Sequence, residues 1–130
     1  MQVLKLKILK SQFSIHKLNL DQKIPESLLQ NRSFFSLTFT DDEKSLICDS
    51  NFFIQSVKRD DGWTCIKLIS KVAIDVTGIW SKITTICSNS NCPVLTVTTF
   101  NTDYFLIKTI ALEKLKSNFS ENNFIFVENE

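Results

Sequence analysis

The sequence predicts an α+β fold in which strands and helices alternate in the order βαββαβ. Two observations in the C-terminal half support this prediction. Residues 76–87 carry apolar side chains at the i, i+3, i+4 and i+7 spacing of an amphipathic helix. Residues 93–107 then form two strand-like runs, rich in β-branched and aromatic residues, around a polar turn at Asn101. Asn tolerates the left-handed backbone of a short turn, so this stretch is predicted to be a β-hairpin.

The elements of the N-terminal half are predicted from shorter patterns. Residues 3–9 alternate Leu or Ile with Lys, which is typical of a strand with one buried face. Pro25 is suited to the first position of a short helix, and residues 49–51 are suited to cap another. The predicted elements are strands at 3–9, 12–18, 34–40 and 44–48, helices at 26–30 and about 51–56, and a polar linker at 58–62.

The C-terminal half is predicted with firmer boundaries. A strand at 63–70 precedes a helix at 77–90, and Asp75 or Thr77 is expected to cap that helix. After the hairpin come a helix at 110–120, capped by Thr109, and a strand at 124–127. Asn91 and Asn123 stand where a left-handed residue usually ends a helix.

This order is the ferredoxin-like arrangement, an antiparallel sheet with both helices on one face. The first half is predicted to be a degenerate or rearranged copy, so the expected domains are residues 1–60 and 61–130 lying side by side.

Composition narrows the class of protein. The chain has 130 residues, 43% of them hydrophobic and 22% charged, with a formal net charge of +1, which gives no indication of nucleic-acid binding. No apolar run has the length of a transmembrane helix, and residues 1–10 do not resemble a signal peptide. We therefore expect a cytoplasmic protein without membrane association.

Chemistry-bearing residues are few. The only histidine is His16, which is more often a satisfied structural side chain than a base, and the four cysteines form no C-x-x-C pair. With only two glycines there is no phosphate-binding loop. The sequence predicts no catalytic triad, no metal site and no cofactor. It predicts that Cys48, Cys65, Cys87 and Cys92 are reduced thiols.

Four stretches resemble the ACT-domain proteins, most closely the small bacterial two-ACT proteins related to animal cytosolic arginine sensors. They are Phe35–Cys48, Gly62–Lys67, Asp75–Ile79 and Thr98–Ile107, the last reading TTFNTDYFLI. The final motif is the most specific. Thr98 stands where the family usually has Ser, and asparagines stand where it has glycines after the helices.

The resemblance implies a regulatory module that binds an amino acid where two ACT units meet. The ligand's α-amino and carboxylate groups would lie against the loop Asp75, Thr77, Gly78 and Ile79, and Asp103 would receive an amino or cationic group. Thr99 and Thr102 would flank Asp103, and Ser45, Leu46 and Ile47 would supply the facing strand. Independently, Gly78 permits close approach to the backbone, and a helix start favours a carboxylate.

Plainer interpretations stay open. Asp103 suits an ordinary turn with its carboxylate in water, and Gly78 suits close helix–sheet packing. The competing functions are an enzyme, and an oligomerising or scaffolding protein that has lost its ligand. The amino acid, the partner protein and the oligomeric state are not identified by the sequence.

Overall fold

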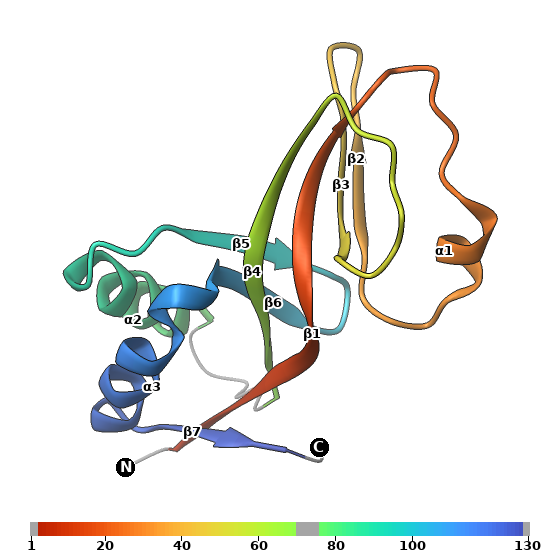
Figure 1. Ribbon diagram of the computed structural model, residues 1–130. Coiled ribbons are helices and arrows are strands. Elements are labelled where there is room, and N and C mark those ends of the chain that lie inside the picture. The colour runs from red at the N-terminus through yellow and green to blue at the C-terminus, as the bar shows by residue number, and fades with distance from the viewer. Residues whose placement is uncertain (1–2, 70–75, 129–130) are drawn as a thin grey trace. The chain divides into compact units, whose positions relative to one another are not determined.

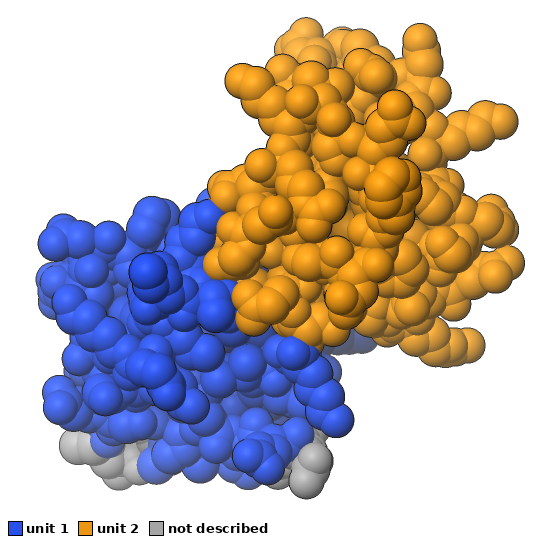
Figure 2. All heavy atoms as spheres, viewed as in Figure 1, with its two compact units in different colours: residues 1–10, 64–130 blue, residues 11–63 orange. Residues whose placement is uncertain are grey.

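The computed structural model describes residues 3–69 and 76–128, which form two compact units. Unit 1 contains residues 1–10 and 64–130, and unit 2 contains residues 11–63 (Figure 2). The sequence-based division at residue 60 puts all of residues 1–60 in the first domain. In the structure, residues 1–10 belong instead to the same unit as the C-terminal part of the chain.

Unit 1 is a sheet covered by two helices (Figure 1). Its strands lie in the order β7–β1–β4–β6–β5, and residues 4–7 of β1 run parallel to β7. The predicted hairpin of β5 and β6 is confirmed. The bounds are β1 Leu4–Leu18, β4 Lys58–Leu68, α2 Val76–Asn89, β5 Val94–Thr98, β6 Asp103–Lys108, the 3₁₀ turn η1 Thr109–Ala111, α3 Leu112–Glu121 and β7 Phe124–Val127.

One apolar core joins both helices of unit 1 to the same face of its sheet. Ile83 of α2 and Phe119 of α3 are fully buried in a cluster with Phe105 and Ile107 of β6 and Phe124 of β7. Both helices therefore cover one face, as their amphipathic spacing predicts.

The helix ends of unit 1 confirm one prediction and correct another. Asn91 and Asn123 have φ of 53° and 68°, so both adopt the predicted left-handed conformation after a helix. The predicted cap at Thr109 is wrong, because α3 begins after Ala111 and has no side-chain cap. Thr109 instead shares a hydrogen bond with Thr64 between hydroxyl oxygens 2.8 Å apart.

Unit 2 has a sheet with less helical cover. Its strands lie in the order β2–β3–β1–β4, where β1 contributes residues 11–18 and β4 residues 58–63. Its core is Leu18, Leu28, Leu46, Cys48 and Ile54. The further bounds are α1 Glu26–Gln30, β2 Ser36–Phe39 and β3 Lys44–Asp49.

Three predictions in this region are wrong. The predicted strands 3–9 and 12–18 form one continuous strand, because the polar residues between them continue the extended backbone. The polar stretch 58–62 is not a linker but the exposed beginning of β4. The predicted helix at 51–56 is a turn followed by irregular backbone, since the Asp49 carboxylate accepts the Asn51 N–H in a local turn instead of capping a helix.

Candidate ligand site at the start of β6

Asp103 begins β6, opposite Thr98 of β5. Alternate residues of a strand share a face, so Asp103 lies on the same face as the core residues Phe105 and Ile107. Its side chain therefore belongs to the layer between sheet and helices, at the end of the strand.

Asp103 is a largely buried residue whose carboxylate has no partner among the described residues. The residue is 7% exposed, and no described residue donates a hydrogen bond to its side chain or forms an ion pair with it. Burying an unpaired carboxylate is costly unless a cation or donor compensates for lost hydration. The Asp103 oxygens are not among the fully buried unpartnered atoms of the described residues, so they reach the surface, and both interpretations left open by the sequence stay open.

The turn before Asp103 is held by its threonines. The N–H and the hydroxyl of Thr99 both donate to the Thr102 carbonyl at 2.8 Å, and the Thr102 N–H returns a bond of 3.1 Å to the Thr99 hydroxyl. These bonds fix the backbone that leads into Asp103. They also occupy the hydroxyl of Thr99 and the backbone N–H and carbonyl of Thr102, two residues that were predicted to line the site.

Helix α2 begins at the same end of unit 1. Trp80, in its second turn, packs edge-on against Phe105, two residues after Asp103, with ring centroids 6.1 Å apart. Thr64, the first β4 residue in unit 1, bonds to Thr109 just after the end of β6, so the unit 1 part of β4 and its neighbour β6 run in opposite directions. The end of β4, the start of α2 and Asp103 therefore lie together.

The predicted loop is only partly described. Asp75 lies outside the described residues. Thr77 and Gly78 lie in the first turn of α2, and Ile79 is buried in the core of unit 1, so Ile79 has only its backbone to offer a ligand. A helix start presents N–H groups and a positive dipole end, which suits a carboxylate.

The residues predicted from the first half lie in unit 2. Ser45 donates a hydrogen bond of 2.6 Å to the Glu43 carboxylate. Leu46 is fully buried in the core of unit 2, and Ile47 is half-buried. All three belong to β3, which pairs with β1 and β2 on its two sides. Their contact with a ligand stays a prediction.

Unit 2 holds a buried polar cluster that the sequence did not reveal as a group. Ser14 and His16 are fully buried on β1. The Ser14 hydroxyl donates to Asp61 at 2.5 Å, and the Arg59 guanidinium also bonds to that carboxylate. His16 Nδ1 lies 2.6 Å from the Ser56 hydroxyl. The only signal in the sequence was that Ser14 and His16 share the strand face of Leu18.

Burial and charge perturb this cluster. Burial, followed by the positive charge of Arg59, lowers the pKa of His16. The hydrogen bond from Ser14 and that from Arg59 lower the pKa of Asp61. His16 Nε2 is buried and has no partner among the described residues, so the prediction of a satisfied histidine holds for only one ring nitrogen.

Other kinds of site are not indicated by the described part of the chain. No three His, Cys, Asp or Glu side chains there are placed to hold a metal ion. Nor does a helix among the residues described have the length and apolar character needed to cross a membrane. All four cysteines are free thiols and buried.

The chain matches known proteins in sequence and in structure. The family model for the ACT domain matches residues 58–115. Protein Atu0741 from Agobacterium tumefaciens is 30% identical, with a TM-score of 0.86, and the alignment covers 100% of this chain and 96% of that one. This chain belongs to the ACT-domain family. No curated protein matches it in sequence.

Two more distant structures share the fold. A protein of unknown function from Vibrio cholerae, VC0802, titled a possible transport protein, is 9% identical with a TM-score of 0.63, covering 91% of this chain and 88% of that one. Aspartokinase III of E. coli, solved with aspartate and ADP, is 13% identical with a TM-score of 0.59, covering 92% of this ACT protein but 32% of the kinase. ACT domains generally bind amino acids in regulatory roles.

Proposed function

We propose that this ACT protein is a non-enzymatic regulatory module that binds a small amino acid, with Asp103 receiving the ligand's amino or cationic group. The observation that carries the proposal is the largely buried Asp103, whose carboxylate has no partner among the described residues, at the start of the strand against which Trp80 of α2 packs. An α-amino acid presents both charges within a few ångströms, and the Asp103 carboxylate and the start of α2 have the complementary signs.

The proposal extends to the whole chain. We propose that both units are ACT-like copies and that the protein acts in the cytoplasm through a partner protein or a second copy of itself. A relation to cytosolic arginine sensors and a ligand contact by Ser45 and Leu46 remain parts of this proposal. The aspartate in the aspartokinase structure supports testing acidic amino acids alongside basic ones.

Thermal unfolding with each common amino acid tests the function. A ligand at one hundred times its dissociation constant stabilises the fold by roughly 2.7 kcal/mol, which raises Tm by several degrees for a chain of this size. Asp103→Asn keeps the side-chain shape and removes the charge, so it is expected to abolish this shift. Glu121→Gln, an exposed acid at the end of α3, is the matched control and is expected to keep it.

The unliganded variant distinguishes a binding role from a structural one. The Asp103 carboxylate has no partner among the described residues, so Asp103→Asn without ligand is expected to unfold close to the wild-type temperature. A variant that binds the amino acid as tightly as wild type shows that the site is misplaced. Destabilisation of the unliganded variant shows that the carboxylate has a structural partner.

Exposed apolar residues favour a second candidate function, that of an oligomerising or scaffolding protein. Phe100 at the tip of the β5–β6 hairpin is 99% exposed, and Ile110 in η1 is 96% exposed. Side chains of this kind are anchors in protein interfaces. Light scattering after gel filtration tests this candidate. Self-association that Phe100→Ser abolishes, in a chain whose Tm no amino acid changes, favours it.

A further inference from the structure

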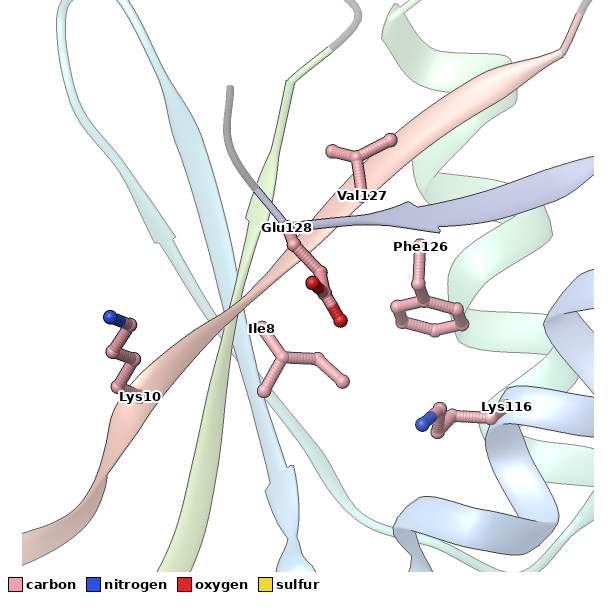
Figure 3. A pocket seen from close by; sticks show the side chains of 6 residues that line it. All are labelled: Ile8, Lys10, Lys116, Phe126, Val127 and Glu128. Atoms are coloured by element: carbon pink, nitrogen blue, oxygen red, sulfur yellow. The ribbon is translucent and has the colours of Figure 1, made fainter.

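A second pocket in unit 1 lies apart from Asp103, between α3, β1 and β7. Its volume is about 580 Å³, within the range of small-molecule sites. Figure 3 shows the Glu128 carboxylate, the Lys116 ammonium and the side chains of Ile8 and Phe126 directed toward a common space, whereas Lys10 points away. The pocket thus combines one cation, one anion and an apolar wall.

The two charges face the pocket without pairing with each other. The ion pair of Lys116 is with Glu113, at 3.7 Å, and the Glu113 side chain is 86% exposed, which makes that pair weak. Among the described residues no ion pair joins Lys116 to Glu128. The Lys116 ammonium also lies 5.9 Å from the centroid of the Phe126 ring, which directs it over the apolar wall.

The pocket is independent of the Asp103 site. The N–H of Ile69 donates to the carbonyl of Lys5 and that of Val57 to the carbonyl of Lys17, so the strands are antiparallel and residues 8–10 lie opposite residues 64–66 in the middle of β4. Asp103 lies instead beside the end of β4. A ligand in one site therefore does not touch the other, and variants of each site are separate probes.

We infer that this pocket binds a small zwitterion with an apolar body, such as an apolar α-amino acid. The ligand's carboxylate pairs with Lys116, its ammonium group pairs with Glu128, and its side chain covers Ile8 and Phe126. The Lys116 side chain is 41% exposed and Glu128 is exposed, so each ion pair contributes modestly and a ligand with both charges binds better than one with a single charge.

The experiment uses the full chain carrying Asp103→Asn, so that binding at the first site does not contribute. L-Leucine and L-phenylalanine are titrated to roughly 20 mM, a range that detects millimolar affinity, while backbone amide NMR signals are followed. Saturable shifts are expected at residues 116 and 126–128. Lys116→Met is expected to weaken binding about two- to fivefold, and Lys114→Met, an exposed lysine on the same helix, to leave it unchanged.

A second part of the experiment varies the charges of the ligand. N-Acetyl-L-phenylalanine lacks the ammonium charge and L-phenylalanine amide lacks the carboxylate, so each is expected to bind more weakly than L-phenylalanine. In Glu128→Gln the preference for L-phenylalanine over its N-acetyl form is expected to disappear. The inference is overturned if no saturable shift occurs at these residues, if Lys116→Met and Lys114→Met bind alike, or if the N-acetyl form binds as tightly. Dispersed spectra of both lysine variants show that folding is not the cause.

Discussion

Units 1 and 2 have related strand orders but different layers over their sheets. In unit 2 the strands, counted along the chain, lie in the order fourth, first, third, second. Unit 1 has this same order once β1, which is inserted between β7 and β4, is set aside. The units therefore differ less in their sheets than in what covers them.

The cover of unit 1 is apolar and helical, whereas that of unit 2 is short and partly polar. Helices of 14 and 10 residues supply core residues in unit 1. In unit 2, α1 has five residues and contributes one buried side chain, Leu28, and the second crossover has no helix. Unit 2 has few helical side chains to pack against its sheet. It contains instead a hydrogen-bonded polar cluster that includes Ser14, His16, Arg59 and Asp61.

The comparison shows that sheets with the same strand order can be stabilised in different ways: by apolar helices packed on one face in unit 1, and partly by buried hydrogen bonds in unit 2. Apolar burial tolerates changes of pH, whereas a buried histidine does not. The predictions below test this difference, beginning with the largest expected effect.

The core of unit 1 is expected to be most sensitive at Phe119. Its ring centroid lies 5.8 Å from that of Phe105 and 5.1 Å from that of Phe124, and the side chain is fully buried. Phe119→Ala is expected to lower the free energy of unfolding by about 3–5 kcal/mol, because it removes these contacts and leaves a cavity. Urea unfolding measures this. Phe100→Ala is the control and is expected to change it by less than about 0.5 kcal/mol.

The cover of unit 2 is expected to make stability depend on pH through His16. Because its pKa is lowered in the folded chain, the unfolded chain binds more protons just below pH 6.5, so stability is full above that pH and is lost as pH falls. Arg59 opposes protonation and Asp61 favours it. Unfolding free energies between about pH 7.5 and 5 are expected to fall in wild type.

His16→Gln is the variant that isolates this effect. The fall in stability between those pH values is expected to be smaller in His16→Gln than in wild type. Loss of the lowered pKa of Asp61 affects stability only below its ordinary value of 3.8, so the two windows are separate. Equal slopes in wild type and variant contradict the prediction.

The sequence predicted unit 1 well because each element has a local signal. The spacing of Ile79, Ile83 and Ile86 defines α2, and Asn91 marks its end without any knowledge of tertiary contacts. The sequence left Asp103 as either a turn residue with its carboxylate in water or a ligand-binding group, and its low exposure depends on tertiary packing that no local pattern indicates. The insertion of β1 beside β7 has no local signal, because pairing between residues 4–7 and 124–127 joins the two ends of the chain.

Unit 2 was predicted less well for related reasons. Residues 58–62 are polar because they begin an exposed part of a strand, and polarity alone is also typical of a linker. The cap-like residues 49–51 form a local turn, an alternative that the same side chains favour. The polar cluster joins residues of β1 with Ser56 and residues of β4, some 40 positions later in the chain, so no local spacing in the sequence indicates it.

Cysteine labelling compares how readily the two units open. Burial raises the pKa of Cys48 in unit 2 and of Cys87 in unit 1 to about 11 each, so ionisation does not distinguish them. We expect Cys48 to react about tenfold faster with iodoacetamide, corresponding to an opening free energy lower by about 1.4 kcal/mol, because fewer apolar contacts cover it. Mass spectrometry of pulse-labelled peptides measures the rates. Faster labelling of Cys87 contradicts the expectation.

The smallest effect is expected where a helix ends in each unit. Asn91 follows α2 with φ of 53°, whereas Asn31 follows α1 with φ of −80°. Glycine adopts a left-handed backbone without strain, so Asn91→Gly is expected to leave Tm unchanged or slightly higher, and Asn91→Ala to cost about 1 kcal/mol. At Asn31 the order reverses, because glycine there adds freedom to the unfolded chain and relieves no strain. Thermal unfolding of the four variants measures both orders. If alanine is tolerated better than glycine at Asn91, the left-handed end of α2 does not stabilise unit 1.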